Sequence, residues 1–315
     1  MSYTDKQIEF IINLVENSEL TYEDITVKFN EKFQEFKTVN SIKKTYYRHI
    51  SKVDDIDKPK ILLLDIESAP MLGYVWSLWD NNVALNQLKS DWYVLAFAAK
   101  WLHEPEDEII YYDQRNAKNI EDDTELLKII WKLMDEATII IGQNHKKFDL
   151  KKLNARFILN GFPPPSSYRT IDTVEIAKSK FGFTSNKLEY MSDKLCKKYK
   201  KLKHAKFSGF ELWKECLAGN IEAWEEMELY NKYDVLSLEE LFLKFAPWDN
   251  TINLDVYNDD LENHCSACNS TEFIKKGFRY TNLGKYQRYQ CKHCGKETSE
   301  RENLLSKEKR KSLRK

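Results

Sequence analysis

The stretch Ile61-Leu62-Leu63-Leu64-Asp65-Ile66-Glu67 decides the fold class, because an apolar run is followed by two acidic residues with a single residue between them. Such a run, bounded by polar residues, is typical of a buried β-strand. Side chains two positions apart on a strand point to the same face, so the carboxylates of Asp65 and Glu67 are expected side by side. The pair can therefore bind one cation.

Two further acidic positions and a tyrosine lie on other predicted elements. Asp149 ends the segment Asn144-His145-Lys146-Lys147-Phe148-Asp149, between an apolar run at 137–141 and a helical pattern that begins at Leu150. We therefore predict that it lies where a strand passes into a helix. Tyr230 and Asp234 lie four residues apart in a long helical pattern. Both side chains should project from one face of that helix.

This set of carboxylates suits phosphodiester hydrolysis. That reaction needs an activated water and a stabilised leaving oxygen, and two divalent ions about 3.5–4 Å apart supply both. Carboxylate oxygens favour Mg2+ or Mn2+, and a set made only of carboxylates argues against zinc. Four clustered carboxylates also repel one another unless cations neutralise them. We therefore expect two Mg2+ (or Mn2+) ions, bound by Asp65, Glu67, Asp149 and Asp234.

The three motifs are Asp65-x-Glu67, Asn144-x3-Phe148-Asp149 and Tyr230-x3-Asp234. In this order they resemble the DnaQ-like 3'-5' exonucleases of the DEDDy type, which carry a tyrosine in the third motif. The resemblance extends to the proofreading domain of family B DNA polymerases and to YprB-like proteins of the ribonuclease H-like superfamily.

The resemblance implies a role for each residue. Asp65 would bridge both ions, Glu67 and Asp234 would complete one site, and Asp149 would hold the second ion through water. Tyr230 would orient the attacking water, while Asn144 and Phe148 would contact the nucleic acid. The alternative is that these residues have only structural roles. Asp65 and Glu67 would be exposed acids at a strand end, Asp149 a helix N-cap, and Tyr230 and Asp234 a half-buried pair on a helix. This alternative requires five separate coincidences. We interpret Asp172, just before another helix, as a cap rather than a ligand.

Apolar stretches at 92–99 and 108–112 predict two strands joined by a short turn at 103–106. With the first strand they would form an antiparallel unit. Helices alternate with the strand at 137–141, so we predict an α/β fold with the mixed sheet of a ribonuclease H-like domain over residues 61–247. Trp92 is expected in the core. For Trp76 and Trp79 two alternatives remain, packing in the core or stacking on an unwound end of a nucleic acid.

Residues 1–51 show three helical patterns, each preceded by a threonine that can cap a helix. They resemble a Myb-like or homeodomain-like helix-turn-helix domain, whose third helix would enter the major groove. Its candidate DNA contacts are Lys43, Lys44 and Arg48. The segment up to residue 57 holds 8 basic and 11 acidic residues, so a protein-docking module is the alternative. A polar linker is expected at 52–60.

Two Cys-x2-Cys pairs lie beyond a second, acidic linker at 248–264; they are Cys265 with Cys268 and Cys291 with Cys294. Their spacing predicts one structural Zn2+ in a zinc ribbon over residues 265–300. The remaining cysteines, Cys196 and Cys216, are expected as buried core residues.

The middle of the predicted ribbon interleaves bases with aromatic residues, which suits phosphate contact and base stacking. The aromatic side chains could instead pack over the zinc knuckle. The candidate nucleic-acid contacts are Lys275, Lys276, Arg279, Lys285 and Arg288. A basic tail follows at 301–315.

The 315 residues include 49 Lys and Arg against 50 Asp and Glu, a net charge of -1. After position 257 there are 14 basic and 8 acidic residues, so positive charge gathers there. The sequence has no run of 18 apolar residues and no basic start followed by an apolar segment. We therefore expect a cytoplasmic protein without a membrane span, and this domain combination could belong to a virus or a mobile element.

Our leading hypothesis is a metal-dependent 3'-5' exonuclease that acts on DNA, with a replication or recombination protein as a further candidate partner. A ribonuclease of the same chemistry is the first alternative, because no visible feature reads a 2'-hydroxyl. The second alternative is a DNA-binding or scaffold protein with a vestigial nuclease site. The intact set of carboxylates argues against this alternative.

Overall fold

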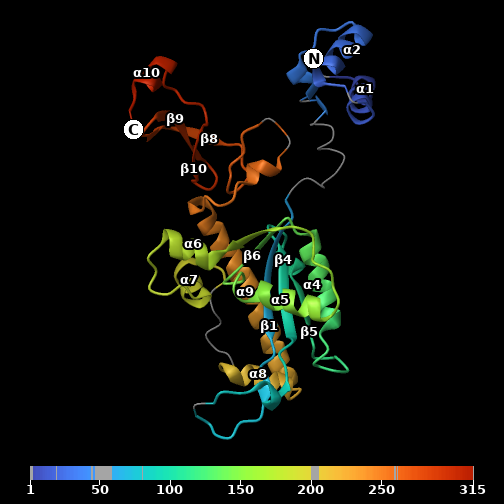
Figure 1. Ribbon diagram of the computed structural model, residues 1–315, viewed down its shortest axis with the longest axis vertical. Coiled ribbons are helices and arrows are strands. Elements are labelled where there is room, and N and C mark those ends of the chain that lie inside the picture. The colour runs from blue at the N-terminus through green and yellow to red at the C-terminus, as the bar shows by residue number, and fades with distance from the viewer. Residues whose placement is uncertain are drawn as a thin grey trace. The chain divides into compact units, whose positions relative to one another are not determined.

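The computed structural model describes residues 3–18, 20–43, 45–46, 59–79, 81–199, 206–258, 260 and 262–314 (Figure 1). The chain divides into two compact units, one of residues 59–249 and one that comprises residues 1–58 and 250–315. None of the helices in the described ranges has the length and apolarity needed to cross a membrane.

A five-stranded mixed sheet, in the order β5-β4-β1-β6-β7, forms the centre of the larger unit. The central strand β1 (Ile61–Ser68) pairs antiparallel with β4 (Val94–Trp101), which pairs antiparallel with β5 (Ile110–Asp113). On its other side β6 (Ile139–Gly142) and β7 (Arg169–Asp172) run parallel to it. The predicted mixed sheet and its antiparallel unit are confirmed, whereas the edge strand β7 is an addition to the prediction.

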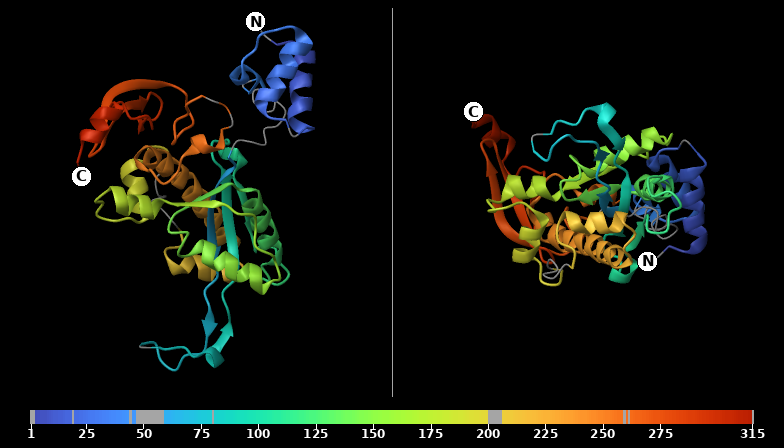
Figure 2. Two further views of the ribbon diagram at one scale, coloured as in Figure 1. Left: turned by 45° about the horizontal axis from the view of Figure 1, so that its top comes forward. Right: turned by 90° about the horizontal axis from the view of Figure 1, so that it is seen from below.

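Helices cover both faces of this sheet (Figure 2). α4 (Thr124–Glu136) and α5 (Asp149–Leu159) pack on one face, where their apolar stripes meet the side chains of alternate β1 residues. The opposite face carries α8 (Phe210–Leu217) and the long helix α9 (Ile221–Phe245). α6 (Thr173–Lys180) and α7 (Leu188–Leu195) pack against α9. Cys196 and Cys216 are buried in this unit, as predicted.

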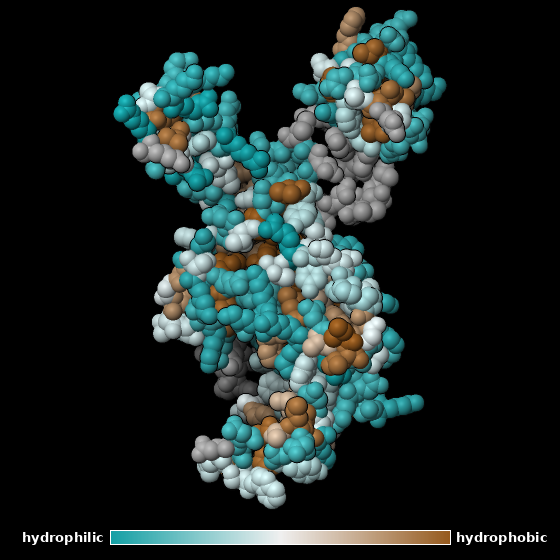
Figure 3. Space-filling view, in the orientation of Figure 1, coloured by the Kyte–Doolittle hydropathy of each residue, from teal (hydrophilic) through white to brown (hydrophobic). Residues whose placement is uncertain are grey.

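The part of the chain that connects β1 to β4 forms an extension (Figure 1). Many of its apolar side chains are exposed (Figure 3). The extension is a hairpin of β2 (Leu72–Gly73) and β3 (Leu88–Ser90) with the short helix η1 (Leu85–Gln87). Trp76 and Trp79 are exposed on it, so core packing within the chain is not their role. Trp92, expected in the core, is only half-buried. A further short helix, η2 (Glu106–Glu108), precedes β5.

The N-terminal segment contains α1 (Asp5–Glu16), α2 (Tyr22–Phe33) and helical residues at 39–43 and 45–46. The predicted capping threonines Thr4 and Thr21 precede the first two helices. A small core of apolar residues joins all three; its buried members are Ile11, Ile25, Phe29 and Ile42. Lys44, Arg48 and most of the predicted linker (52–58) lie outside the described residues.

The C-terminal segment is built on a three-stranded sheet in the order β10-β9-β8. Its strands are β8 (Phe273–Thr281), β9 (Gly284–Cys291) and β10 (Glu297–Ser299). The short helices η3 (Ala246–Trp248) and η4 (Leu254–Tyr257) precede it, and α10 (Lys307–Ser312) follows it. The Leu254 N–H donates to the Ser266 carbonyl, so the predicted linker at 248–264 is joined to the ribbon by backbone contact. The domain limits drawn from the sequence stay a prediction.

Candidate active site

Asp65 and Glu67 lie near the end of the central strand, on the face covered by α9. Their neighbours Leu64 and Ile66 point to the opposite face, into the core formed with α4 and α5. On β4 the residues opposite Asp65 and Glu67 are alanines, Ala98 and Ala96. Small side chains at these positions leave room beside the two carboxylates.

Asp149 reaches the same place from the start of α5. β6 pairs with β1 only as far as Leu63, so β1 runs on beyond its parallel neighbour. The Ile66 N–H there donates to Asp149 Oδ1 at 3.3 Å. This contact explains how a residue 83 positions away in the chain comes to lie beside the central strand.

Helix α9 supplies the third motif. Asp234 faces the strand carboxylates: one oxygen from each of Asp65, Glu67 and Asp234 lies within 4.8 Å of the others. Tyr230 is one helical turn earlier, and its ring makes an edge contact with Trp213, with 6.4 Å between ring centres. The structure thus brings the five predicted residues of the three motifs to one place.

Asn231 also contributes to this site, and the sequence prediction missed it. Its Nδ2 donates to Asp65 Oδ2 at 2.6 Å, and the side chain is fully buried. Its Oδ1 is buried without a hydrogen-bond partner among the described residues. The only sequence signal is its position three residues before Asp234, which places both side chains on one helix face.

The carboxyl groups hold their protons more tightly than usual. Burial is the main cause of the raised pKa of Asp65, followed by the charges of Asp149, Glu67 and Asp234. Burial and the nearby Asp234 and Asp149 raise the pKa of Glu67 in the same way. The pKa of Asp149 is raised by burial to about 6, although the Ile66 N–H opposes the shift. A divalent cation would remove this repulsion, so the residues present fit Mg2+ or Mn2+.

These pKa shifts predict a pH dependence of stability. A carboxyl group whose pKa is higher in the folded protein stabilises the fold only while it is protonated. The contribution of Asp149 should be complete below about pH 4 and lost as the pH rises through about 6, a change of at most about 3 kcal/mol.

We expect the thermal midpoint of the metal-free protein to fall between pH 5 and pH 7.5, and Mn2+ to reverse the fall at the higher pH. Differential scanning calorimetry of protein in EDTA, with and without excess Mn2+, measures both effects. An Asp149→Asn variant serves as the control, because it should show a flatter pH dependence. A metal-free midpoint that rises across this range in the wild type would contradict the assignment.

Asp172 acts as a cap, as predicted. Its carboxylate accepts the N–H groups of Val174, at the start of α6, and of Asn144 and Lys146 in the loop before α5. Asn144 adopts a left-handed backbone conformation (φ 59°), which asparagine tolerates better than most residues. The cap therefore shapes the loop that leads into Asp149.

The predicted nucleic-acid contacts lie at several places. Asn144 and Phe148 are exposed, and Phe148 directly precedes Asp149 in the chain. In the N-terminal segment, Lys43 Nζ lies over the Tyr22 ring, 4.9 Å from its centre. On the ribbon, Lys275, Lys276 and Arg279 are exposed on β8, and Lys285 and Arg288 on β9 are half-buried. Lys285 Nζ lies 3.9 Å from the centre of the Phe278 ring.

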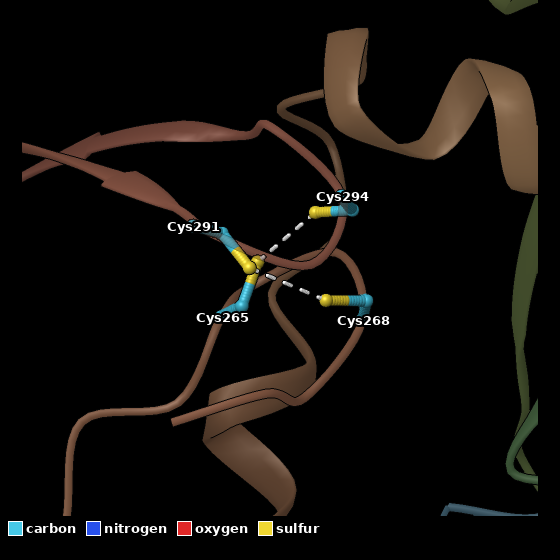
Figure 4. A group of neighbouring side chains, drawn as sticks. All are labelled: Cys265, Cys268, Cys291 and Cys294. Atoms are coloured by element: carbon cyan, nitrogen blue, oxygen red, sulfur yellow. Dashed lines mark hydrogen bonds between the residues drawn. The ribbon is translucent and has the colours of Figure 1, made fainter. Parts of the chain in front are cut away.

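Four cysteine side chains converge in the C-terminal segment (Figure 4). The sulfur atoms of Cys265 and Cys294 are 3.5 Å apart, and those of Cys268 and Cys291 are 3.6 Å apart. A tetrahedral ion with metal–sulfur bonds of about 2.3 Å would separate the sulfurs by about 3.8 Å. Burial disfavours the Cys291 thiolate, but the N–H groups of Cys294 and His293 lower its pKa to about 7. The cluster is consistent with a zinc ribbon.

A sequence model of the RNase H superfamily matches residues 85–245, about half of the chain. The chain belongs to the RNase H superfamily. Within this RNase H domain the matched residues include Asp149, Tyr230 and Asp234 but begin after β1, so the structure alone brings Asp65 and Glu67 to them. Membership supports a nuclease-type function that involves nucleic acid.

No curated protein sequence matches this RNase H superfamily member. Among solved structures, it is similar to the family B DNA polymerase from the hyperthermophilic archaeon Pyrobaculum calidifontis, with 14% sequence identity and a TM-score of 0.39. The similarity covers 64% of this chain and 27% of the polymerase chain. The chain therefore spans about a quarter of the length of that polymerase.

Proposed function

We propose that the chain is a metal-dependent 3'-5' exonuclease that hydrolyses phosphodiester bonds in DNA by a two-metal mechanism. The observation that carries the proposal is the convergence of Asp65, Glu67 and Asp234 within 4.8 Å, beside Tyr230 and Asp149. Such a group of carboxylates is costly in a folded protein unless it binds cations.

In this proposal the carboxylates would hold two Mg2+ or Mn2+ ions. Asp65 would contribute to both sites, Glu67 and Asp234 would complete one, and Asp149 would serve the other. When bound, the ions supply an activated water and charge stabilisation at the scissile phosphate. Asn231 holds the Asp65 carboxylate in a fixed orientation through its 2.6 Å hydrogen bond.

Substrate binding would involve the segments on either side of the RNase H domain. The N-terminal helices and the C-terminal ribbon would bind nucleic acid, the former through the segment that contains Lys43 and the latter through the basic residues of β8 and β9. One Zn2+ bound by the four cysteines would hold the ribbon together. These flanking units would raise the local concentration of DNA at the carboxylates.

The experiment that tests the proposal is a time course on end-labelled strands with Mg2+, Mn2+ or EDTA. Matched DNA and RNA, each single-stranded and double-stranded and labelled at either end, form the substrates. A 3'-5' exonuclease shortens a 5'-labelled strand stepwise and releases nucleotides at once from a 3' label. Faster cleavage of RNA would instead favour a ribonuclease, and binding without cleavage under any metal would favour a scaffold protein.

Tyr230→Phe should reduce turnover while leaving metal binding nearly unchanged. Burial and the nearby Asp234, Glu67 and Asp65 raise the pKa of Tyr230, so the phenol keeps its proton and can orient a water molecule. We expect kcat to fall on the order of 10²-fold. Mn2+ titration by calorimetry on the same variant checks that the carboxylate site is intact. Normal turnover would show that Tyr230 only packs against Trp213.

A further inference from the structure

The ammonium group of Lys152 lies close to two aromatic rings, near Asp149 of the carboxylate site. Its Nζ is 3.8 Å from the centre of the Trp92 ring and 5.0 Å from the centre of the Phe148 ring. Lys152 is on α5, three residues after Asp149, so it lies one helical turn from a proposed metal ligand. The Trp92-Lys152-Phe148 cluster therefore adjoins the place where a substrate would be cleaved.

The Lys152 ammonium differs from the neighbouring Arg156 guanidinium. Arg156 lies 5.9 Å from the same Trp92 ring, but it also binds both carboxylate oxygens of the buried Asp123. For Lys152 Nζ, the described residues offer no hydrogen bond or ion pair, only the longer-range attraction of Asp91 and Asp149. The Lys152 side chain is half-buried, and this burial lowers its pKa. A phosphate oxygen would supply the anionic partner that the described residues do not.

The two rings of the cluster can also contact a ligand. Phe148 is 42% exposed and directly precedes Asp149, and Trp92 is half-buried two residues before β4. An aromatic ring next to a cation suits a nucleotide, because the base can stack on the ring while the phosphate binds the ammonium group. A base can stack in this way only when it is unpaired.

We propose that Trp92, Lys152 and Phe148 form a nucleotide subsite, in which Lys152 binds a backbone phosphate adjacent to the scissile one and the rings stack on unpaired bases. The proposal rests on the nuclease function argued above. It deepens that function by adding Trp92 and Lys152, two residues outside the three motifs, as contacts to the substrate strand.

The test is equilibrium binding of a short fluorescent oligodeoxynucleotide to the full chain, in EDTA so that no cleavage occurs. Lys152→Met keeps the apolar stem and removes the charge. We expect it to weaken binding about tenfold and to reduce the slope of log affinity against log salt by about 0.7, the loss of one phosphate contact in a single strand. Lys152→Arg should restore the slope.

Lys151→Met is the matched control, because Lys151 is the neighbouring residue of α5 and its side chain is exposed. It should change neither affinity nor slope. Trp92→Leu should weaken binding of the single strand roughly 5- to 150-fold, the value of one stacked base, and should leave a blunt duplex nearly unaffected.

The outcomes separate this inference from the proposed function. A Lys152→Met slope equal to that of Lys151→Met, in a variant with wild-type thermal midpoint, would overturn the subsite. If Lys152→Met does not fold, unchanged single-strand binding by Trp92→Leu would overturn it instead. A wild-type chain that neither binds nor cleaves nucleic acid would overturn the proposed function itself, whatever the variants do.

Discussion

Asp65→Asn is expected to abolish metal-dependent cleavage, with a loss of activity on the order of 10³-fold or more. Asp65 lies at the centre of the group, because the charges of Asp149, Glu67 and Asp234 all act on it. Its replacement removes one negative charge and one cation ligand. The rate of cleavage in Mg2+ and in Mn2+, together with calorimetric Mn2+ binding, measures the effect.

The same variant should not lose stability. Without metal, the amide at position 65 ends the repulsion with the neighbouring carboxylates, so the thermal midpoint of the metal-free protein should stay equal or rise. The control is Glu225→Gln, an exposed carboxylate on α9 that should leave activity unchanged. Wild-type cleavage by Asp65→Asn would refute the proposed active site, whereas a lowered midpoint would show that Asp65 has a structural role.

Cys291→Ser should abolish binding of the proposed zinc ion and unfold the C-terminal ribbon without unfolding the unit of residues 59–249. A structural zinc contributes about 10–16 kcal/mol of binding free energy in small domains, far more than a three-stranded sheet can replace. We expect the zinc content, measured by inductively coupled plasma mass spectrometry, to fall from one per chain to nearly none. Limited proteolysis should then cut within residues 265–300, while the larger unit stays resistant.

This variant also tests the proposed role of the ribbon. We expect it to cleave short oligonucleotides but to bind long DNA more weakly and with a shallower salt dependence, because fewer basic side chains contact phosphate. Cys196→Ala is the control, since Cys196 lies in the larger unit and its loss should leave the zinc bound. Superimposable plots of affinity against salt for wild type and Cys291→Ser would mean that the ribbon does not touch nucleic acid.

Several features of this protein were predictable because their signals are local. The apolar run before Asp65 specifies a buried strand through side-chain burial alone, and its two-residue period places Asp65 and Glu67 on one face. Thr21 marks a helix start because its side chain accepts the N–H of Asp24, which is only three residues away in the chain. Each Cys-x2-Cys pair likewise sets two sulfurs close together before any long-range contact forms.

Other features needed the tertiary structure. The edge strand β7 has only one apolar residue, Ile171, so it lacks the apolar run that predicted β6, a strand of the same length. Trp92 was expected in the core because its neighbours are apolar, but the position of α5 sets Lys152 over its ring instead. The extension that connects β1 to β4 is as rich in apolar residues as a protein core. Only the structure shows that these side chains are exposed.

By itself, the sequence determined the types of the main elements and which acidic side chains share a strand or a helix face, because these follow from the chain's own periodicity. The tertiary structure decided which elements meet. It brought Asn231 into hydrogen-bond contact with Asp65, which is 166 positions away in the chain. It likewise brought Asp149 to the Ile66 N–H, which is 83 positions away. Contacts of this kind depend on how a helix packs on a sheet and on where one strand extends beyond its neighbour. Neither can be predicted from the local order of residues.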